Sequence, residues 1–322
     1  MALPASFEAD RSFFVKDTPA PPKHCSDKIR RHTDIFYKIE HEAHVRVGDH
    51  PRIVRYYGWD ERGLLFEKHT GGDMLTRLLV QRDPTPALST RLQWACDVAE
   101  GMAFLHSKGV IWVDVSMTNV LLPEGSDRAV LCDLGGAYIL PMPQYKPLPK
   151  ELQTTVVTVH PMMGLPNYPH KHVWDGEGHA PVAEISPHFD RFGYGIMLFS
   201  LLSLRFPHSR FLVIHDFEES MRIADLHFSY HFDTLGDVPE YAAFEAIIQK
   251  CFRAEYKSSD DLMADVKAAS AAMPKDAPLL QARVEDPIRE YAPSTGRHLF
   301  PFDREDFDGE AYSDDDDDTD SN

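Results

Sequence analysis

The feature that most constrains the fold is a run of sixteen residues, 189–204 (FDRFGYGIMLFSLLSL). It predicts a helix that is apolar on nearly every side after its first turn. Such a helix must be buried in the middle of a folded lobe, because water would contact apolar side chains in any other position. The run is shorter than the roughly 18 apolar residues that span a bilayer, and no other stretch reaches that length. We therefore expect a helical lobe built around residues 189–204.

Length and composition fit a globular chain. The 322 residues suffice for one two-lobed domain of about 250 residues with tails, or for two domains of about 150. The formal net charge of -18 argues against nucleic acids and anionic membranes as partners, since both bind basic surfaces. The N-terminus lacks a basic start followed by an apolar core, so we expect a cytoplasmic or nuclear location. Widely spaced cysteines favour reduced thiols over disulfides: Cys25, Cys96, Cys132 and Cys251.

Apolar periodicity predicts the other elements. Three- and four-residue spacing indicates helices at residues 33–47, 88–105, 241–252 and 258–273. Short apolar runs bounded by turn residues indicate strands at residues 12–16, 50–59, 63–69, 110–113 and 129–134. The acidic end, residues 312–322 (YSDDDDDTDSN), cannot bury apolar surface and is predicted to be disordered.

The sharpest polar pattern follows a predicted helix and strand. Asp114 begins the segment DVSMTN, which ends at Asn119, and the next strand leads into Asp133-Leu134-Gly135. Here the sequence resembles the protein kinases, whose catalytic loop has an aspartate with an asparagine five residues later, followed by a strand that delivers aspartate-x-glycine. The aspartate and asparagine alone would be a weak signal, because both are common in turns and helix caps. Their position between the predicted elements makes it specific.

The resemblance implies ATP and Mg²⁺ as cofactors. In this family a carboxylate orients the attacking hydroxyl group while oxygen ligands hold magnesium against the phosphates. By this resemblance, Asp114 would be the base. Asn119 and Asp133 would be the metal ligands.

The surrounding segments extend the resemblance over roughly residues 40–273. The segment LLFEKHTGGDM looks like the sheet edge and hinge, with Phe66 as the gatekeeper. The backbone from Glu67 to His69 would then face adenine, and Asp73 would meet the ribose.

Two further segments match the family's second lobe. Asp190 resembles the aspartate that holds the backbone of the catalytic loop, although a helix N-cap is the alternative interpretation. The segment CFRAEYKSSDDLMADV, from residue 251 to residue 266, resembles the family's closing pair of helices.

The family's ion pair between a strand lysine and a helix glutamate has competing candidates. Lys16, in the predicted strand, is the candidate lysine, and Lys23 is a poorer one because prolines precede it. Glu40 is the candidate glutamate, with Glu42 as the alternative. No glycine precedes Gly48 in this sequence, so the glycine-rich loop is absent or replaced, or it belongs to a longer N-terminus.

The predicted catalytic loop departs from the family pattern at three positions. Trp112 and Val113 stand where the family has histidine and arginine, and Ser116 replaces a lysine. Each change removes a charged or titratable group. Cationic stabilisers of this kind are commonly worth about 3 kcal/mol of barrier, so we expect slow chemistry.

We therefore predict an α+β, two-lobed protein-kinase-like fold with a reduced β-rich N-lobe and a mainly helical C-lobe. The expected parts are residues 1–69 (partial N-lobe and hinge), 70–285 (C-lobe) and 286–322 (acidic tail). The predicted function is transfer of the γ-phosphoryl group of ATP to a protein hydroxyl group, serine or threonine before tyrosine, with low activity. An inactive pseudokinase that binds protein partners and a small-molecule phosphotransferase are the alternatives.

Overall fold

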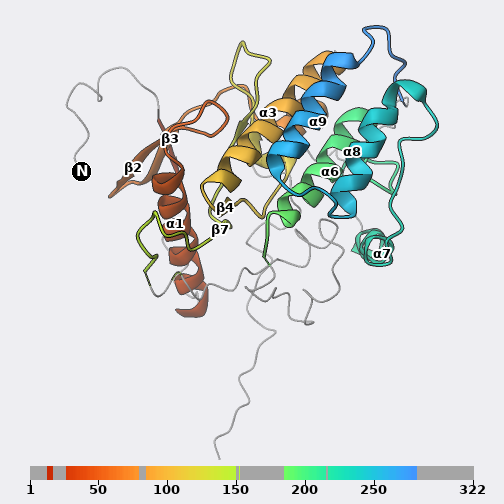
Figure 1. Ribbon diagram of the computed structural model, residues 1–322. Coiled ribbons are helices and arrows are strands. Elements are labelled where there is room, and N and C mark those ends of the chain that lie inside the picture. The colour runs from red at the N-terminus through yellow and green to blue at the C-terminus, as the bar shows by residue number, and fades with distance from the viewer. Residues whose placement is uncertain are drawn as a thin grey trace, which may run out of the picture.

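The computed structural model describes residues 13–16, 27–79, 85–149, 152, 185–214 and 217–280. A small sheet and one long helix lie on one side of the molecule, and a bundle of helices lies on the other (Figure 1). This arrangement confirms the predicted two-lobed α+β fold with a small β-containing lobe and a mainly helical lobe.

The small lobe contains a three-stranded antiparallel sheet in the order β1-β3-β2. Its strands are β1 (Phe13–Lys16), β2 (Tyr56–Asp60) and β3 (Gly63–Glu67). In the register of β1 and β3, Lys16 lies opposite Leu64. Helix α1 (Asp27–Val47) lies beside this sheet (Figure 1). The prediction began this helix at residue 33, six residues after its observed start.

Helix α1 turns one face toward the sheet. Its buried residues Tyr37, Glu40, His44 and Val47 follow three- and four-residue spacing. The rings of His44 and Phe66, on strand β3, have centroids 5.1 Å apart. The face that covers the sheet therefore also carries the helix's buried glutamate.

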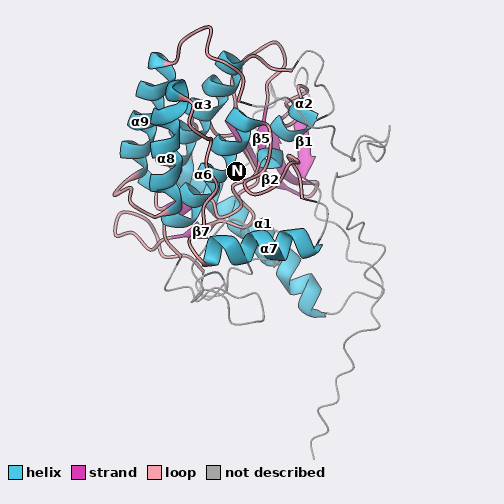
Figure 2. Cartoon of the chain, turned by 90° about the vertical axis from the view of Figure 1, so that its right-hand side faces the viewer, coloured by secondary structure: helices cyan, strands magenta, loops and turns pink. Residues whose placement is uncertain are grey.

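The large lobe is built around helix α6 (His188–Ser203), in which every residue from Phe189 to Ser203 is buried. The burial predicted for this run is confirmed. Helices α3 (Leu88–Ser107), α8 (Ala242–Phe252) and α9 (Ser259–Ala272) pack side by side with α6 (Figure 2). The other described helices of this lobe are α2 (Met74–Leu79) and α7 (Phe217–Phe228).

Two glycines let other segments approach α6 closely. A Cβ atom added at Gly193 would lie 2.9 Å from the Cβ of Val115, and one at Gly195 would lie 2.8 Å from the Cβ of Cys251. Both distances are too short for real side chains, so glycine permits these contacts. The first of them brings the segment that begins at Asp114 directly against the buried helix.

Four very short strands connect the lobes' main elements. They form two antiparallel pairs, β4 with β7 and β5 with β6. Their bounds are β4 (Val110–Ile111), β5 (Val120–Leu121), β6 (Val130–Leu131) and β7 (Tyr138–Ile139). The 3-10 turn η2 (Met117–Asn119) lies just before β5, and η6 (Pro239–Tyr241) lies before α8.

The sequence did not predict helices α2 and α7, nor strands β5 and β7. Helix α2 has only six residues, too few to show a periodic apolar pattern. Strands of two residues leave no alternation to detect. Within the described residues, no helix combines the length and the apolar character needed to cross a membrane. The predicted acidic tail, 286–322, lies outside the described residues.

Candidate functional site

One lysine connects three elements of the chain. Lys16 ends strand β1, and its Nζ atom lies 2.7 Å from Oε2 of Glu40 and 2.9 Å from Oδ1 of Asp133. Glu40 lies on α1, whereas Asp133 is the second residue after β6. Of the two candidate glutamates, Glu40 makes this contact because it lies on the buried face of α1, whereas Glu42 is only partly buried and lies off that face. Lys23 lies outside the described residues.

The electrostatics of this contact depend on burial. The Glu40 side chain is only 3% exposed, whereas those of Lys16 and Asp133 are 29% and 44% exposed. Burial raises the pKa of Glu40 to about 7, although the Lys16 ammonium group opposes that rise. For Lys16, burial acts to lower the pKa, but Asp133 and Glu40 outweigh it and raise the pKa above its ordinary value. The lysine is therefore held in its charged form.

Asp114 and Asn119 form a second pair close to the first. The Asn119 side-chain nitrogen Nδ2 donates to Oδ2 of Asp114 at 2.8 Å and to its backbone carbonyl at 3.2 Å. The backbone carbonyl of Asn119 accepts the N–H of Cys132 at 2.9 Å, which fixes Asn119 beside the strand that leads into Asp133. Burial, followed by the charge of Asp133, raises the pKa of Asp114 to about 6. The fold therefore brings Asp114 and Asn119 close to Asp133, which follows them in the sequence by more than ten residues.

Asp190 holds the backbone in front of Asp114. Its carboxylate, fully buried, accepts the backbone N–H groups of Trp112 and Val113, each at 2.7 Å. Val113 has φ of 69°, in the left-handed region that a β-branched residue rarely adopts. The two hydrogen bonds stabilise this strained turn. His106, at the end of α3, also bonds Asp190, with 2.6 Å between Nε2 and Oδ2.

Sequence reasoning missed two residues of this network. The Trp112 indole Nε1–H donates to the backbone carbonyls of Cys132 at 3.1 Å and Asp133 at 3.2 Å. Trp112 thus connects the predicted catalytic loop to the turn that carries Asp133. The sequence showed only that Trp112 stands where the family has a histidine. His106 could have been suspected from its place at the end of a predicted helix, but nothing local indicates its partner Asp190.

The predicted hinge residues lie at and after the end of β3. Phe66 is buried, 4% exposed, between the rings of His44 and Tyr56. The backbone N–H of Glu67 already donates to the carbonyl of Arg55 at 2.9 Å. The contact of Glu67 with adenine therefore remains a prediction for its carbonyl group alone.

The last two hinge predictions concern His69 and Asp73. Burial lowers the pKa of His69, so its imidazole is neutral near pH 7. Asp73 precedes α2, and its carboxylate accepts both the backbone N–H of Thr76 at 2.8 Å and the Thr76 hydroxyl group at 2.7 Å. Asp73 therefore caps this helix, and its contact with ribose remains a prediction.

The oxygen donors at this site fit a magnesium ion. Asp133 offers a partly exposed carboxylate, and the Nδ2 bonds of Asn119 leave its side-chain oxygen with no partner among the described residues. Across the described residues, no cluster of three or more histidine, cysteine, aspartate or glutamate side chains could hold a metal. Magnesium commonly takes only one or two protein oxygens, with phosphate oxygens and water as the other ligands. Two protein donors therefore suffice for this ion.

The domain resembles a phosphotransferase in three respects. They are its fold, the pairing of Lys16 with a helix glutamate, and the turn that carries Asp114 and Asn119. Residues 22–258 match the protein kinase domain family, which covers more than half of the chain. The chain therefore belongs to the protein kinase family.

Curated relatives agree with this assignment. A dual serine/threonine and tyrosine protein kinase from Bos taurus is 55% identical over 121 residues, which is 36% of this chain and 12% of the relative. The protein of the same name from Gallus gallus is 34% identical over 121 residues, with the same coverage of both chains. The serine/threonine-protein kinase RUNKEL from Arabidopsis thaliana is 34% identical over 91 residues, 27% of this chain and 6% of the relative. The chain thus spans a small part of the length of these relatives.

Proposed function

We propose that this chain binds ATP with Mg²⁺ and transfers the γ-phosphoryl group to a protein hydroxyl group, at serine or threonine before tyrosine, at a low rate. The observation that carries the proposal is the contact of Lys16 with both Glu40 and Asp133, at 2.7 and 2.9 Å. Kinases use such a lysine to hold the nucleotide's phosphates, and it must be in place together with the metal-binding aspartate.

Each residue of this contact has a role that its surroundings support. Glu40, almost fully buried, limits the positions open to the Lys16 ammonium group. The charge on Lys16 would attract the phosphates of ATP, because the raised pKa keeps the lysine protonated. The partly exposed carboxylate of Asp133 can then turn toward a metal ion when phosphates take its place beside the lysine.

Asp114 is the proposed base. A pKa of about 6 leaves it ionised near pH 7, while making it a better proton acceptor than an ordinary aspartate. Its hydrogen bond from Asn119 orients the carboxylate, and Asp190 fixes the backbone just before it through Trp112 and Val113. These contacts support a role in which Asp114 positions a substrate hydroxyl group and accepts its proton.

Asn119 and Asp133 are the proposed ligands of Mg²⁺. When bound, magnesium would neutralise charge on the phosphates. The protein's own part is to hold the two oxygen donors, through the backbone bond from Cys132 to Asn119 and the bond from the Trp112 indole to the backbone carbonyl of Asp133.

A non-enzymatic pseudokinase is the second candidate, and Ser116 favours it. Ser116 replaces the family's lysine, and its hydroxyl group lies 2.6 Å from that of Thr118. The loop therefore offers no cation from this position to the transferred phosphoryl group, which is expected to cost about a hundredfold in rate. A small-molecule phosphotransferase is the third candidate. The match to the protein kinase domain family favours a protein substrate.

Two measurements test the proposal. Thermal unfolding with ATP, with and without Mg²⁺, should show a magnesium-dependent rise in melting temperature that Asp133→Asn abolishes. The matched control is Asp237→Asn, an exposed aspartate far along the chain that should leave the rise unchanged. Transfer of labelled phosphate to the chain itself or to a generic basic protein should then be lost in Asp114→Asn.

The outcomes separate the candidates. Magnesium-dependent ATP binding with transfer that needs Asp114 supports the kinase. Binding without any transfer supports the pseudokinase instead. No binding of ATP at all contradicts the proposed nucleotide site.

A further inference from the structure

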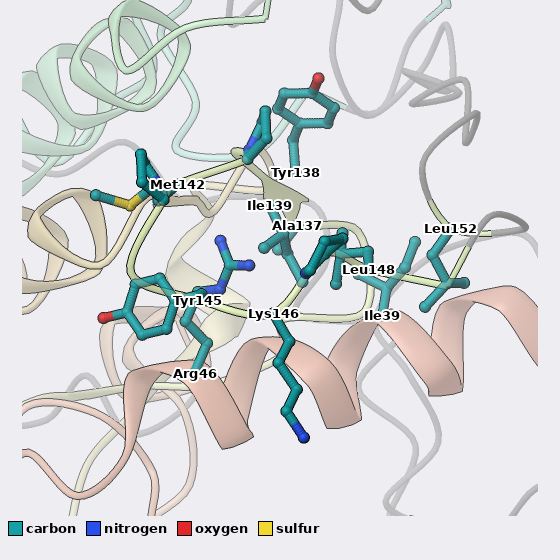
Figure 3. A pocket seen from close by; sticks show the side chains of 13 residues that line it. Ile39, Arg46, Ala137, Tyr138, Ile139, Met142, Tyr145, Lys146, Leu148 and Leu152 are labelled. Atoms are coloured by element: carbon teal, nitrogen blue, oxygen red, sulfur yellow. The ribbon is translucent and has the colours of Figure 1, made fainter.

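A cavity of about 610 Å³ lies between helix α1 and the segment that follows strand β7 (Figure 3). This volume falls within the range of about 300–1,000 Å³ that is typical of small-molecule sites. The proposed nucleotide site uses Glu40 of the same helix, but Glu40, Lys16 and Asp133 do not line the cavity. It is lined by Ile39, Arg46, Ala137, Tyr138, Ile139, Pro141, Met142, Pro143, Tyr145, Lys146, Pro147, Leu148 and Leu152.

Most of the lining is apolar. Ile39 of α1 and Ile139 of β7 are both buried, and Leu148 packs against the same hydrophobic core. Pro141, Pro143 and Pro147 lie on the segment that closes the cavity opposite α1. Because proline fixes its backbone φ angle, this side is partly preformed. An apolar ligand body would therefore replace water here without much ordering of the protein.

Arg46 supplies the cavity's central polar group. Figure 3 shows its guanidinium group pointing from α1 toward the segment around Ile139. One nitrogen, Nη1, donates to the carbonyl of Leu140 at 2.5 Å, and the group lies over the Tyr145 ring, 4.6 Å from the centroid. A guanidinium group has five N–H donors in a planar fork, so others remain for a ligand.

The lining of the cavity contains two basic side chains and no acidic one, although the chain as a whole is acidic. Lys146 also lines the cavity, but its side chain extends along α1, away from the Arg46 guanidinium group (Figure 3). Among the described residues, no carboxylate lies within ion-pair distance of Arg46 or Lys146. Glu42, one turn before Arg46 on α1, acts on the guanidinium group through its charge, but it does not line the cavity. The whole chain, by contrast, carries a formal charge of -18. The cavity therefore complements an anion.

We propose that this cavity binds a small molecule with an apolar body and a single carboxylate group, which Arg46 holds. Arginine is suited to this role because its planar fork matches the two oxygens of a carboxylate. The apolar body would contact Ile39 and Leu148. A neutral ligand would leave the remaining donors of Arg46 without an anionic acceptor, and a cationic ligand would be repelled.

The test uses three probes that share an eight-carbon chain: octanoate, octanol and octylammonium. Each is titrated into the full chain, below the concentration at which it aggregates, and binding is measured by calorimetry and ligand-observed NMR. Octanoate should bind saturably to one site, at least fivefold more tightly than octanol. Octylammonium should show no saturable binding.

Two variants locate the site. Arg46→Met should weaken octanoate binding at least fivefold while leaving octanol binding unchanged. The matched control is Arg55→Met, because Arg55 is an exposed arginine that does not line the cavity and pairs with Asp49 at 3.4 Å. Leu148→Trp fills the cavity without altering the guanidinium group, and it should abolish binding even if Arg46→Met fails to fold.

Several results would overturn the proposal. They are the absence of saturable octanoate binding, equal binding of octanol or octylammonium, and octanoate binding that survives Leu148→Trp. Equal loss of binding in Arg46→Met and Arg55→Met would also overturn it, because that result assigns the effect to overall charge. None of these measurements depends on ATP, so they stand apart from the proposed kinase function.

Discussion

Replacing Trp112 with phenylalanine tests whether its indole N–H holds the turn that carries Asp133. The substitution keeps an aromatic ring in the fully buried position but removes the donor that bonds the carbonyls of Cys132 and Asp133 at 3.1 and 3.2 Å. Asp133 has φ of 55°, an uncommon conformation that needs support from its surroundings. We expect the variant to be less stable and its Asp133 turn to be less fixed.

The magnitude follows from the lost hydrogen bond. Removing one partner of a buried hydrogen bond costs about 1–3 kcal/mol, because the remaining group has no water to replace it. For a domain of this size, about 2 kcal/mol lowers the melting temperature by about 4–8 °C. Because phenylalanine has a smaller ring than tryptophan, the variant also loses packing contacts, and this packing loss must be subtracted from the measured loss of stability.

The Trp94→Phe variant measures this packing loss without the loss of a hydrogen bond. Trp94 is also buried, 3% exposed, but its indole nitrogen has no hydrogen-bond partner among the described residues. Both variants lose the same part of the ring, whereas only Trp112→Phe loses a hydrogen bond. Urea unfolding should therefore show a loss about 1–3 kcal/mol greater for Trp112→Phe than for Trp94→Phe. Equal losses would refute the reasoning.

Two further predictions concern His44 and Ala254. Burial, followed by the charge of Lys16, lowers the pKa of His44 to about 3 in the folded protein. Below pH 6.5, His44 is therefore protonated in the unfolded chain while it is still neutral in the folded one. As the pH is lowered below 6.5, the free energy of unfolding should therefore decrease by up to about 1.4 kcal/mol per pH unit. A His44→Phe variant should lose this dependence, and urea midpoints that decrease with the same slope in the variant would contradict the prediction. Ala254 follows helix α8 with φ of 55°, a conformation that glycine adopts without strain. Ala254→Gly should raise the free energy of unfolding by about 1 kcal/mol, and a lower urea midpoint would count against it.

The sequence by itself determined the elements whose signals are local. The run around Phe189–Ser203 predicted a buried helix because its apolar character extends around the whole helix. The spacing of Asp114, Asn119 and Asp133 between predicted elements was enough to identify the family resemblance, because those intervals are read along the chain alone. The predicted start of α1 at residue 33 was wrong, because the helix begins at Asp27.

Only the tertiary structure decided which residues meet. Lys16 and Asp133 lie 117 positions apart, and they meet only because β1 pairs with β3 and the turn after β6 approaches α1. The same holds for the indole of Trp112, whose bonds to Cys132 and Asp133 cross 20 and 21 positions. Local patterns fix helices and strands through backbone geometry, whereas the partners of a buried polar side chain depend on how those elements pack. The cavity at Arg46 likewise exists only because a proline-rich segment packs against α1.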